Sequence, residues 1–205
     1  MDIRIAPMTG DEITEALPAL ARLRIEVFKE WPYLYEGTLE YEQTYLKRFS
    51  AARDAIIVAA FDGAQIVGVA TASPLLAHTK EFAPLFAARE LDPEAVFYCG
   101  ESVLLPPYRG RGIGHAFFDH REAHARNCSN ATGAFTHTAF CGVVRAPQDP
   151  RKPDGYIPLD GFWRKRGYAP APGLRGSYSW REIGAEPETA KPMQFWLRPL
   201  EPVIT

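Results

Sequence analysis

Residues 108–114, with the sequence Tyr-Arg-Gly-Arg-Gly-Ile-Gly, constrain the fold of this chain more than any other segment. The residues before them, 96–105, are rich in β-branched and aromatic side chains and favour a strand. Two prolines then end that strand, because proline has no backbone N–H to donate to a neighbouring strand. Downstream, one stripe at helical spacing is formed by Ile113, Phe117, His120 and His124. The sequence therefore predicts a strand, a glycine-rich turn and a helix that begins near Gly112.

A turn of this kind forms a cradle for an anion. Its successive backbone N–H groups and the positive end of the helix dipole face the same space, and its glycines place no Cβ in the path of a ligand. A Walker phosphate loop is excluded, because no Gly-Lys-Ser/Thr follows the turn. The dinucleotide-binding pattern needs its third glycine three residues after the second, whereas Gly110, Gly112 and Gly114 are spaced by two. We expect the ligand to be a phosphate compound of another class.

The turn resembles the pyrophosphate-binding loop of the GNAT superfamily of acyl-CoA-dependent N-acyltransferases. That family's pattern is Arg/Gln-x-x-Gly-x-Gly/Ala between a strand and a helix, and Arg109-x-x-Gly112-x-Gly114 meets it. The resemblance implies that acetyl-CoA is bound by Arg109, Gly110, Arg111, Gly112, Ile113 and Gly114 at its diphosphate, and by Val103 and Leu104 at its pantetheine arm. The alternative is a structural turn with exposed arginines.

The rest of the chain predicts a regular succession of elements. These are a strand at 3–5, helices at 13–27 and 40–50, a β-hairpin of 55–61 and 65–71, one short helix within 74–94, a strand at 133–140, a helix at 159–166, and strands at 176–183 and 193–197. The hairpin strands are nearly all apolar, so both faces of the sheet should be covered. The order is that of the GNAT family, and residues 161–168 resemble its second recognisable segment, Phe-Tyr-x-x-x-Gly-Phe. The resemblance implies an α/β fold with a mixed, mostly antiparallel central sheet flanked by helices, in a single domain of residues 1–205.

Acyl transfer to an amine needs a base, an oxyanion stabiliser and an acid for the leaving thiolate. GNAT proteins often use a carboxylate on the strand before the loop as the base, and Glu101 is the only carboxylate inside that strand. The alternative is a Glu101 that faces solvent or forms a structural ion pair. Where the family often has a catalytic tyrosine this chain has Trp163, whose indole N–H donates a hydrogen bond but does not transfer a proton. Tyr168, Tyr156 and water stay open as the acid, and we include Tyr168 in the predicted catalytic pair.

The acceptor side is predicted at the aromatic loop between the first two helices, which carries Trp31, Tyr33 and Glu36. In the GNAT family this loop lines the acceptor, and aromatic faces beside a carboxylate suit a cationic amine. The alternative, that the rings only plug the edge of the sheet, stays open. Cys99 and Cys141 have no visible cysteine–histidine pairing, so we expect an N-acetyltransferase that works by direct attack. The rival function is a non-catalytic acyl-CoA-binding sensor or interaction module, which the tryptophan at the usual acid position favours.

The composition of the chain limits the classes of partner that we expect it to bind. A net charge of −2 leaves no electrostatic footprint for nucleic acid. Three cysteines without Cys-x-x-Cys spacing argue against a disulfide framework or a zinc ribbon. His120 and His124 lie one helical turn apart, but no third ligand is evident, so we predict no metal. Without an apolar leader or a run of about 18 apolar residues, we expect a soluble cytoplasmic protein with no membrane partner. Its substrate is expected to be a small-molecule or peptide amine, and the sequence leaves monomer and homodimer open.

Overall fold

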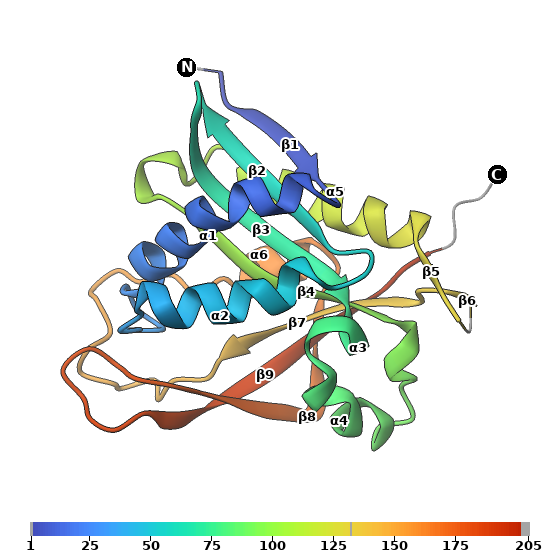
Figure 1. Cartoon of the computed structure of the whole chain (residues 1–205). Coiled ribbons are helices and arrows are strands. Elements are labelled where there is room, and N and C mark those ends of the chain that lie inside the picture. Colours follow the sequence, from blue (N-terminus) through green and yellow to red (C-terminus); the bar gives the residue numbers. More distant parts are fainter. Residues whose placement is uncertain (1, 132, 202–205) are drawn as a thin grey trace.

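One seven-stranded sheet organises the chain, with the strand order β1-β2-β3-β4-β7-β9-β8 (Figure 1). A computed structural model describes residues 2–131 and 133–201. The strands are β1 (Arg4–Met8), β2 (Ile56–Asp62), β3 (Gln65–Pro74), β4 (Val96–Leu104), β7 (His137–Val143), β8 (Ala169–Trp180) and β9 (Thr189–Pro199). Every neighbouring pair is antiparallel except β4 and β7, which are parallel. The predicted mixed, mostly antiparallel sheet is confirmed.

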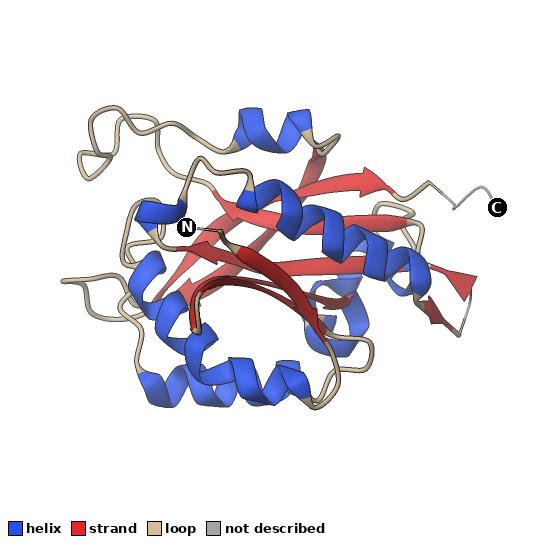
Figure 2. Cartoon of the chain, turned by 90° about the horizontal axis from the view of Figure 1, so that it is seen from above, coloured by secondary structure: helices blue, strands red, loops and turns tan. Residues whose placement is uncertain are grey.

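Helices cover both faces of this sheet (Figure 2). The long helices are α1 (Glu12–Phe28), α2 (Leu39–Ser50) and α5 (Ile113–Asn127). Successive residues of a strand point to opposite faces, and β2 shows the consequence. Ile57 packs in the cluster beneath α1 and α2, whereas Ile56 and Val58 pack in the cluster beneath α5. Apolar side chains therefore line both faces of the strand, as the hairpin sequence predicts.

Shorter elements complete the fold. They are α3 (Leu75–His78), α4 (Ala83–Ala87), α6 (Asp160–Lys165), three 3₁₀ turns η1 (Lys80–Phe82), η2 (Pro93–Ala95) and η3 (Pro106–Tyr108), and a small hairpin of β5 (Ser129–Asn130) and β6 (Gly133–Ala134). The segment 74–94 thus holds two short helices instead of the predicted one.

Several predicted strands have other bounds in the structure. The strand expected at 3–5 is Arg4–Met8, and the strand expected at 193–197 is Thr189–Pro199. The strand expected at 133–140 starts only at His137, because Gly133–Ala134 pairs with Ser129–Asn130 instead. The strand expected at 176–183 begins at Ala169, ahead of Pro170 and Pro172. Prolines are tolerated there because β8 is the edge strand of the sheet.

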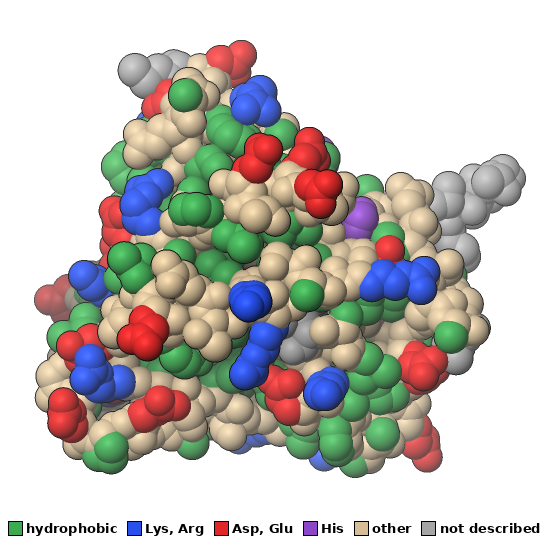
Figure 3. Space-filling view, viewed as in Figure 1, with side chains coloured by type: hydrophobic (Ala, Val, Ile, Leu, Met, Phe, Trp, Pro, Cys, Tyr) green, Lys and Arg blue, Asp and Glu red, His purple; other side chains and the backbone are tan. Residues whose placement is uncertain are grey.

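The surface over α1 and α2 mixes charges. Lysine and arginine side chains lie among aspartates and glutamates on this face (Figure 3). No helix in the described part of the chain combines the length and the apolar character that crossing a bilayer requires.

Candidate active site

The glycine-rich turn follows the end of β4 and leads directly into α5. Gly110 and Gly112 have φ of 76° and 80°, in the left-handed region that side-chain-bearing residues rarely adopt. A Cβ built at either position would meet nothing within 4 Å. Backbone conformation, and not crowding, therefore requires glycine here. Gly112 is also the N-cap of α5, so the first N–H groups of the helix face the space beside the turn.

Side chains on both flanks hold the turn in place. The hydroxyl of Tyr108 donates to Asp62 at 2.7 Å, which ties the turn to the β2–β3 hairpin. The guanidinium of Arg109 donates to the carbonyl of Leu104 at 3.2 Å and to Glu30 at 2.9 Å. Arg109 and Arg111 are both exposed. The turn thus presents positive side chains to solvent on a fixed backbone.

The strands β4 and β7 pair only at one end. Their parallel register runs from Val96 opposite His137 to Tyr98 opposite Ala139 and then stops, although β4 continues to Leu104. A cavity of about 450 Å³ occupies the opening. Its lining includes Cys99, Gly100, Glu101, Ser102 and Leu104 from β4, Phe140 and Cys141 from β7, Arg109 and Gly114 from the turn, Arg121 from α5, Trp31 and Tyr33 from the aromatic loop, and Tyr156, Phe162 and Trp163. This cavity joins the glycine turn to the middle of the sheet.

A β-bulge shapes the floor of that cavity. The β3–β4 register shifts between Ala70 and Ala72, opposite Gly100 and Glu101. A Cβ on residue 100 would lie 2.6 Å from Oγ1 of Thr71, so glycine leaves room for that hydroxyl. From the α5 side, the buried Arg121 donates through Nη1 to the carbonyls of Thr71 and Glu101, each at 3.2 Å. The arginine thereby holds the two strands together where their ladder is irregular.

Glu101 lies at the centre of a buried network. It forms an ion pair with Arg24, accepts from the hydroxyl of Tyr45 at 2.7 Å and accepts from Thr71 at 2.5 Å. Arg24 also donates to Glu42 at 2.5 Å. Burial raises the pKa of Tyr45 well above its usual value, and the neighbouring charge of Glu101 raises it further. These contacts fix the position of the Glu101 side chain.

A second cavity, of about 120 Å³, meets the first at Glu101. Both cavities are lined by Phe28, Tyr33, Gly100, Glu101 and Cys141. The second one is otherwise lined largely by aromatic side chains, namely Tyr35, Tyr41, Tyr45, Tyr98, Tyr178 and Trp180. A ligand in each cavity would therefore have one end beside the same carboxylate.

Several predicted residues line these cavities and others do not. Trp31 and Tyr33 line the larger cavity, and Trp31 faces the ring of Tyr156 at 6.2 Å. Glu36 is half exposed, pairs with Arg181 at 3.4 Å and lines neither cavity. The side chain of Val103 is buried against α1 and α2, which leaves only its backbone on the strand edge.

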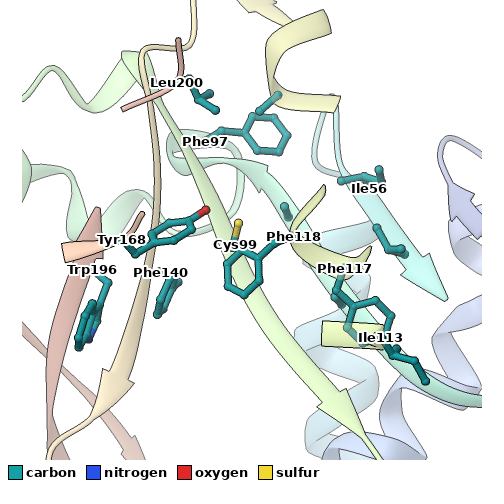
Figure 4. Packing of buried hydrophobic residues seen from close by; sticks show 14 of the residues in the cluster. Ile56, Phe97, Cys99, Ile113, Phe117, Phe118, Phe140, Tyr168, Trp196 and Leu200 are labelled. Carbon is teal, nitrogen blue, oxygen red and sulfur yellow. The ribbon is translucent and has the colours of Figure 1, made fainter. Parts of the chain in front are cut away.

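Tyr168 lies in the core beneath α5, away from both cavities. Figure 4 shows its ring beside Phe140 and Trp196. Its hydroxyl is 2.8 Å from that of Thr138 and donates to Glu122 at 3.2 Å. Burial raises the pKa of this hydroxyl above its ordinary value. The predicted acid is thus held within the protein interior.

Sequence reasoning missed Arg24, Thr71 and Arg121, which position Glu101 and its strand. For Arg24 a signal existed, since a charged side chain stands on the otherwise apolar stripe of α1. Of the two histidines one turn apart, His124 has partners within the protein: its Nε2 lies 3.0 Å from the carbonyl of Asp54, and its ring meets that of Phe97 edge-on. Within residues 2–131 and 133–201, no three histidine, cysteine, aspartate or glutamate side chains gather where they could hold a metal ion.

The sequence matches the Acetyltransferase (GNAT) family over residues 20–146, from within α1 to just past β7. The chain belongs to this family. The matched residues of this GNAT protein include the glycine turn, Glu101 and Arg24. A comparison with curated protein sequences finds no match.

Solved structures share the GNAT fold at low sequence identity. Arabidopsis thaliana NAA60 in complex with acetyl-CoA is 14% identical, with a TM-score of 0.60, over 97% of this chain and 99% of that one. Ribosomal-protein-alanine N-acetyltransferase from Brucella melitensis is 17% identical, with a TM-score of 0.57, over 98% and 100%. The ribosomal-protein-S18-alanine N-acetyltransferase from Escherichia coli is 9% identical, with a TM-score of 0.58, over 98% and 95%. These neighbours support the fold.

Proposed function

We propose that this chain is an N-acetyltransferase that moves an acetyl group from acetyl-CoA to a primary amine of a small molecule or peptide by direct attack. The observation that carries the proposal is the opening between β4 and β7. It lies beside the positive-φ glycine turn at one end and reaches Glu101 at the other. A neighbour that holds acetyl-CoA and neighbours named for acting on a protein alanine support the same donor and acceptor.

The residues of the turn fit a CoA diphosphate. Gly110 and Gly112 leave their N–H groups without side-chain cover, and Arg109 and Arg111 add two positive charges. Beyond the turn, the backbone edge of Val103 and Leu104 faces the opening where β7 no longer pairs. A strand edge of this kind offers N–H and C=O groups to an amide-bearing arm. We therefore assign residues 103–104 and 109–114 to the donor.

In this proposal Glu101 accepts the proton of the incoming ammonium, directly or through a water. A free amine with a pKa near 10 is almost wholly protonated at neutral pH, so such a base is needed. Arg24 and Tyr45 hold the carboxylate of Glu101 in a fixed position at the end of the opening. The proton must then pass on to solvent or to the leaving thiolate.

Direct attack by the amine is favoured over a cysteine nucleophile. Cys141 lines both cavities, but burial raises the pKa of its thiol to about 12. The thiolate is the nucleophilic form of cysteine, and so little of it is present at neutral pH. Trp163 lines the larger cavity, but its indole N–H does not transfer a proton. The hydroxyl of Tyr168 is bonded to Glu122 in the core. The proposal therefore assigns no general acid.

One observation favours the rival function. The carboxylate of Glu101 is engaged by Arg24, Tyr45 and Thr71, as a purely structural glutamate would be. A chain that binds acetyl-CoA as a sensor would retain the glycine turn and the opening without needing a base.

A coenzyme-release assay separates the two functions. Acetyl-CoA is offered with polyamines, amino acids, aminoglycosides, arylalkylamines and peptides, and free thiol is measured. The enzyme releases coenzyme with at least one class of amine. Tight binding of acetyl-CoA without amine-dependent release would favour the sensor.

A further inference from the structure

We propose that the smaller cavity selects the acceptor, and that it takes a primary amine attached to one aromatic or comparably large apolar group with no second charge. This inference rests on the proposed function, because it places the amine at the end of the cavity where Glu101 meets the donor opening. The cavity lies between the aromatic loop and the C-terminal strands. An isolated bridge between Tyr35 and Glu182 ties these two segments together, and they lie side by side in Figure 1.

The polar tips of Tyr35, Tyr98 and Trp180, three of the aromatic side chains in the cavity wall, are already bonded within the protein. The hydroxyl of Tyr35 donates to Glu42 at 2.8 Å, and the hydroxyl of Tyr98 lies 3.1 Å from Sγ of Cys141. The indole of Trp180 donates to a backbone carbonyl at 2.9 Å. What these side chains present to a ligand is therefore their ring faces and edges, which favour apolar and aromatic groups.

The charges of the cavity wall are paired. Arg24 lies between Glu101 and Glu42 and bonds to both. One ammonium group can approach Glu101 from the cavity junction. A second ammonium, as in a polyamine, would have to enter a wall of aromatic rings or compete with Arg24 for its carboxylates, and removing it from water without a partner is costly. The arrangement therefore disfavours multiply charged amines.

The volume suits one ring. The cavity measures about 120 Å³, a little less than the cavity of about 150 Å³ that holds benzene in another protein, so a ring fits when one wall side chain moves aside. Met193, near the middle of β9, is 3% exposed and forms part of the wall. Its unbranched, flexible side chain can adjust to a phenyl or an indole group. Filling a pocket of this kind with an aromatic group changes affinity by about tenfold to a hundredfold.

The test compares kcat/KM for phenethylamine, propylamine and putrescine with acetyl-CoA in excess. The expected order is phenethylamine first, by at least about tenfold over the other two. A peptide with N-terminal phenylalanine and a matched peptide with N-terminal glycine, run beside them, distinguish a free arylalkylamine from a peptide as the source of the ring. Preference for the phenylalanine peptide over both phenethylamine and the glycine peptide identifies a peptide substrate.

A variant that fills the cavity gives a second readout. Met193→Trp should lower the ratio of kcat/KM for phenethylamine to that for propylamine by about tenfold. Met8→Trp, the same substitution on β1 outside both cavities, should leave the ratio unchanged. Retained stabilisation by acetyl-CoA shows that each variant is folded.

The outcomes separate this inference from the proposed function. If propylamine or putrescine is acetylated as well as phenethylamine, the inference is wrong while the enzyme stands. If no amine releases coenzyme, the proposed function fails. Calorimetry with phenethylamine and propylamine then tests whether the smaller cavity binds an aromatic amine. Binding at least about tenfold tighter than propylamine supports the aromatic site, and equal or absent binding overturns it.

Discussion

Thr71 and Glu101 are joined by two hydrogen bonds that run in opposite directions. The backbone N–H of Glu101 donates to Oγ1 of Thr71 at 2.9 Å, and the same hydroxyl donates to Oε2 of Glu101 at 2.5 Å. One side chain on β3 therefore sets both the bulged backbone of β4 and the direction of its carboxylate. The shape of the bulge and the position of the proposed base are coupled.

Thr71→Val should uncouple them. Valine keeps the shape of threonine but removes both bonds, so the buried N–H of Glu101 loses this acceptor and its carboxylate loses this donor. We expect the free energy of unfolding to fall by about 1–3 kcal/mol and kcat to fall by roughly tenfold. Urea unfolding and steady-state kinetics measure the two effects. Thr71→Ser, which keeps the hydroxyl, is the matched control, and a serine variant as damaged as the valine variant would contradict the coupling.

Glu101→Gln tests the base itself. Glutamine keeps the approximate shape of Glu101 but replaces one acceptor oxygen with an NH₂ donor and removes the negative charge and the basicity, so kcat should fall by roughly 10²–10⁴-fold while acetyl-CoA affinity holds. Part of the loss should return at high pH, because more of the acceptor amine is then neutral. A pH profile of kcat for both proteins checks this. Normal turnover by the variant would place the base elsewhere.

Gly112→Asp should abolish acetyl-CoA binding without unfolding the chain. The added carboxylate would lie in the path of the diphosphate with a like charge. Gly112→Asn is the control, because asparagine has nearly the same shape, tolerates positive φ and carries no charge. Thermal stabilisation by acetyl-CoA is the measurement. An aspartate variant with wild-type stabilisation would refute the assignment of the turn.

The aromatic loop is tested by Trp31→Ala and Tyr33→Ala. Tyr33 lines both cavities, so Tyr33→Ala should raise the acceptor KM. Trp31 lines only the larger cavity, which the proposal gives to acetyl-CoA, so Trp31→Ala should weaken acetyl-CoA binding and change the acceptor KM less. Glu36→Gln should have little effect, because Glu36 lies outside both cavities beside Arg181. Steady-state kinetics with varied acceptor check the three variants. Unchanged kinetics with lost stability would mean that the rings only pack.

The stability of the chain should depend on pH through His137. Burial lowers the pKa of this histidine below its usual 6.5, so the unfolded chain binds the proton more readily. The contribution of His137 to the free energy of unfolding is therefore fully present above pH 6.5, and it is lost as the pH falls through the lower pKa of the folded state. His137→Gln should lose less stability than wild type between pH 7.5 and pH 5. Urea unfolding at both pH values measures it, and equal losses would exclude a contribution from His137.

Local patterns predicted much of the fold. The β2–β3 hairpin follows from two apolar runs around Asp62-Gly63, and α2 follows from its helical spacing. The predictions failed where a strand depends on its neighbours. The prolines of β8 conceal the start of that strand, and only its place at the sheet edge makes them acceptable.

The glycine turn could be predicted from the sequence alone, because a strand stopped by prolines, glycines in left-handed conformations and a helix start are local properties of residues 96–114. It did not determine what surrounds Glu101. Arg24, Tyr45 and Thr71 lie 77, 56 and 30 residues away in the chain and come from α1, α2 and β3. Their meeting depends on how the two helices pack on the sheet and on the bulge opposite Thr71. Such long-range contacts are decided by the packing of the whole sheet and its helices, which no local pattern contains.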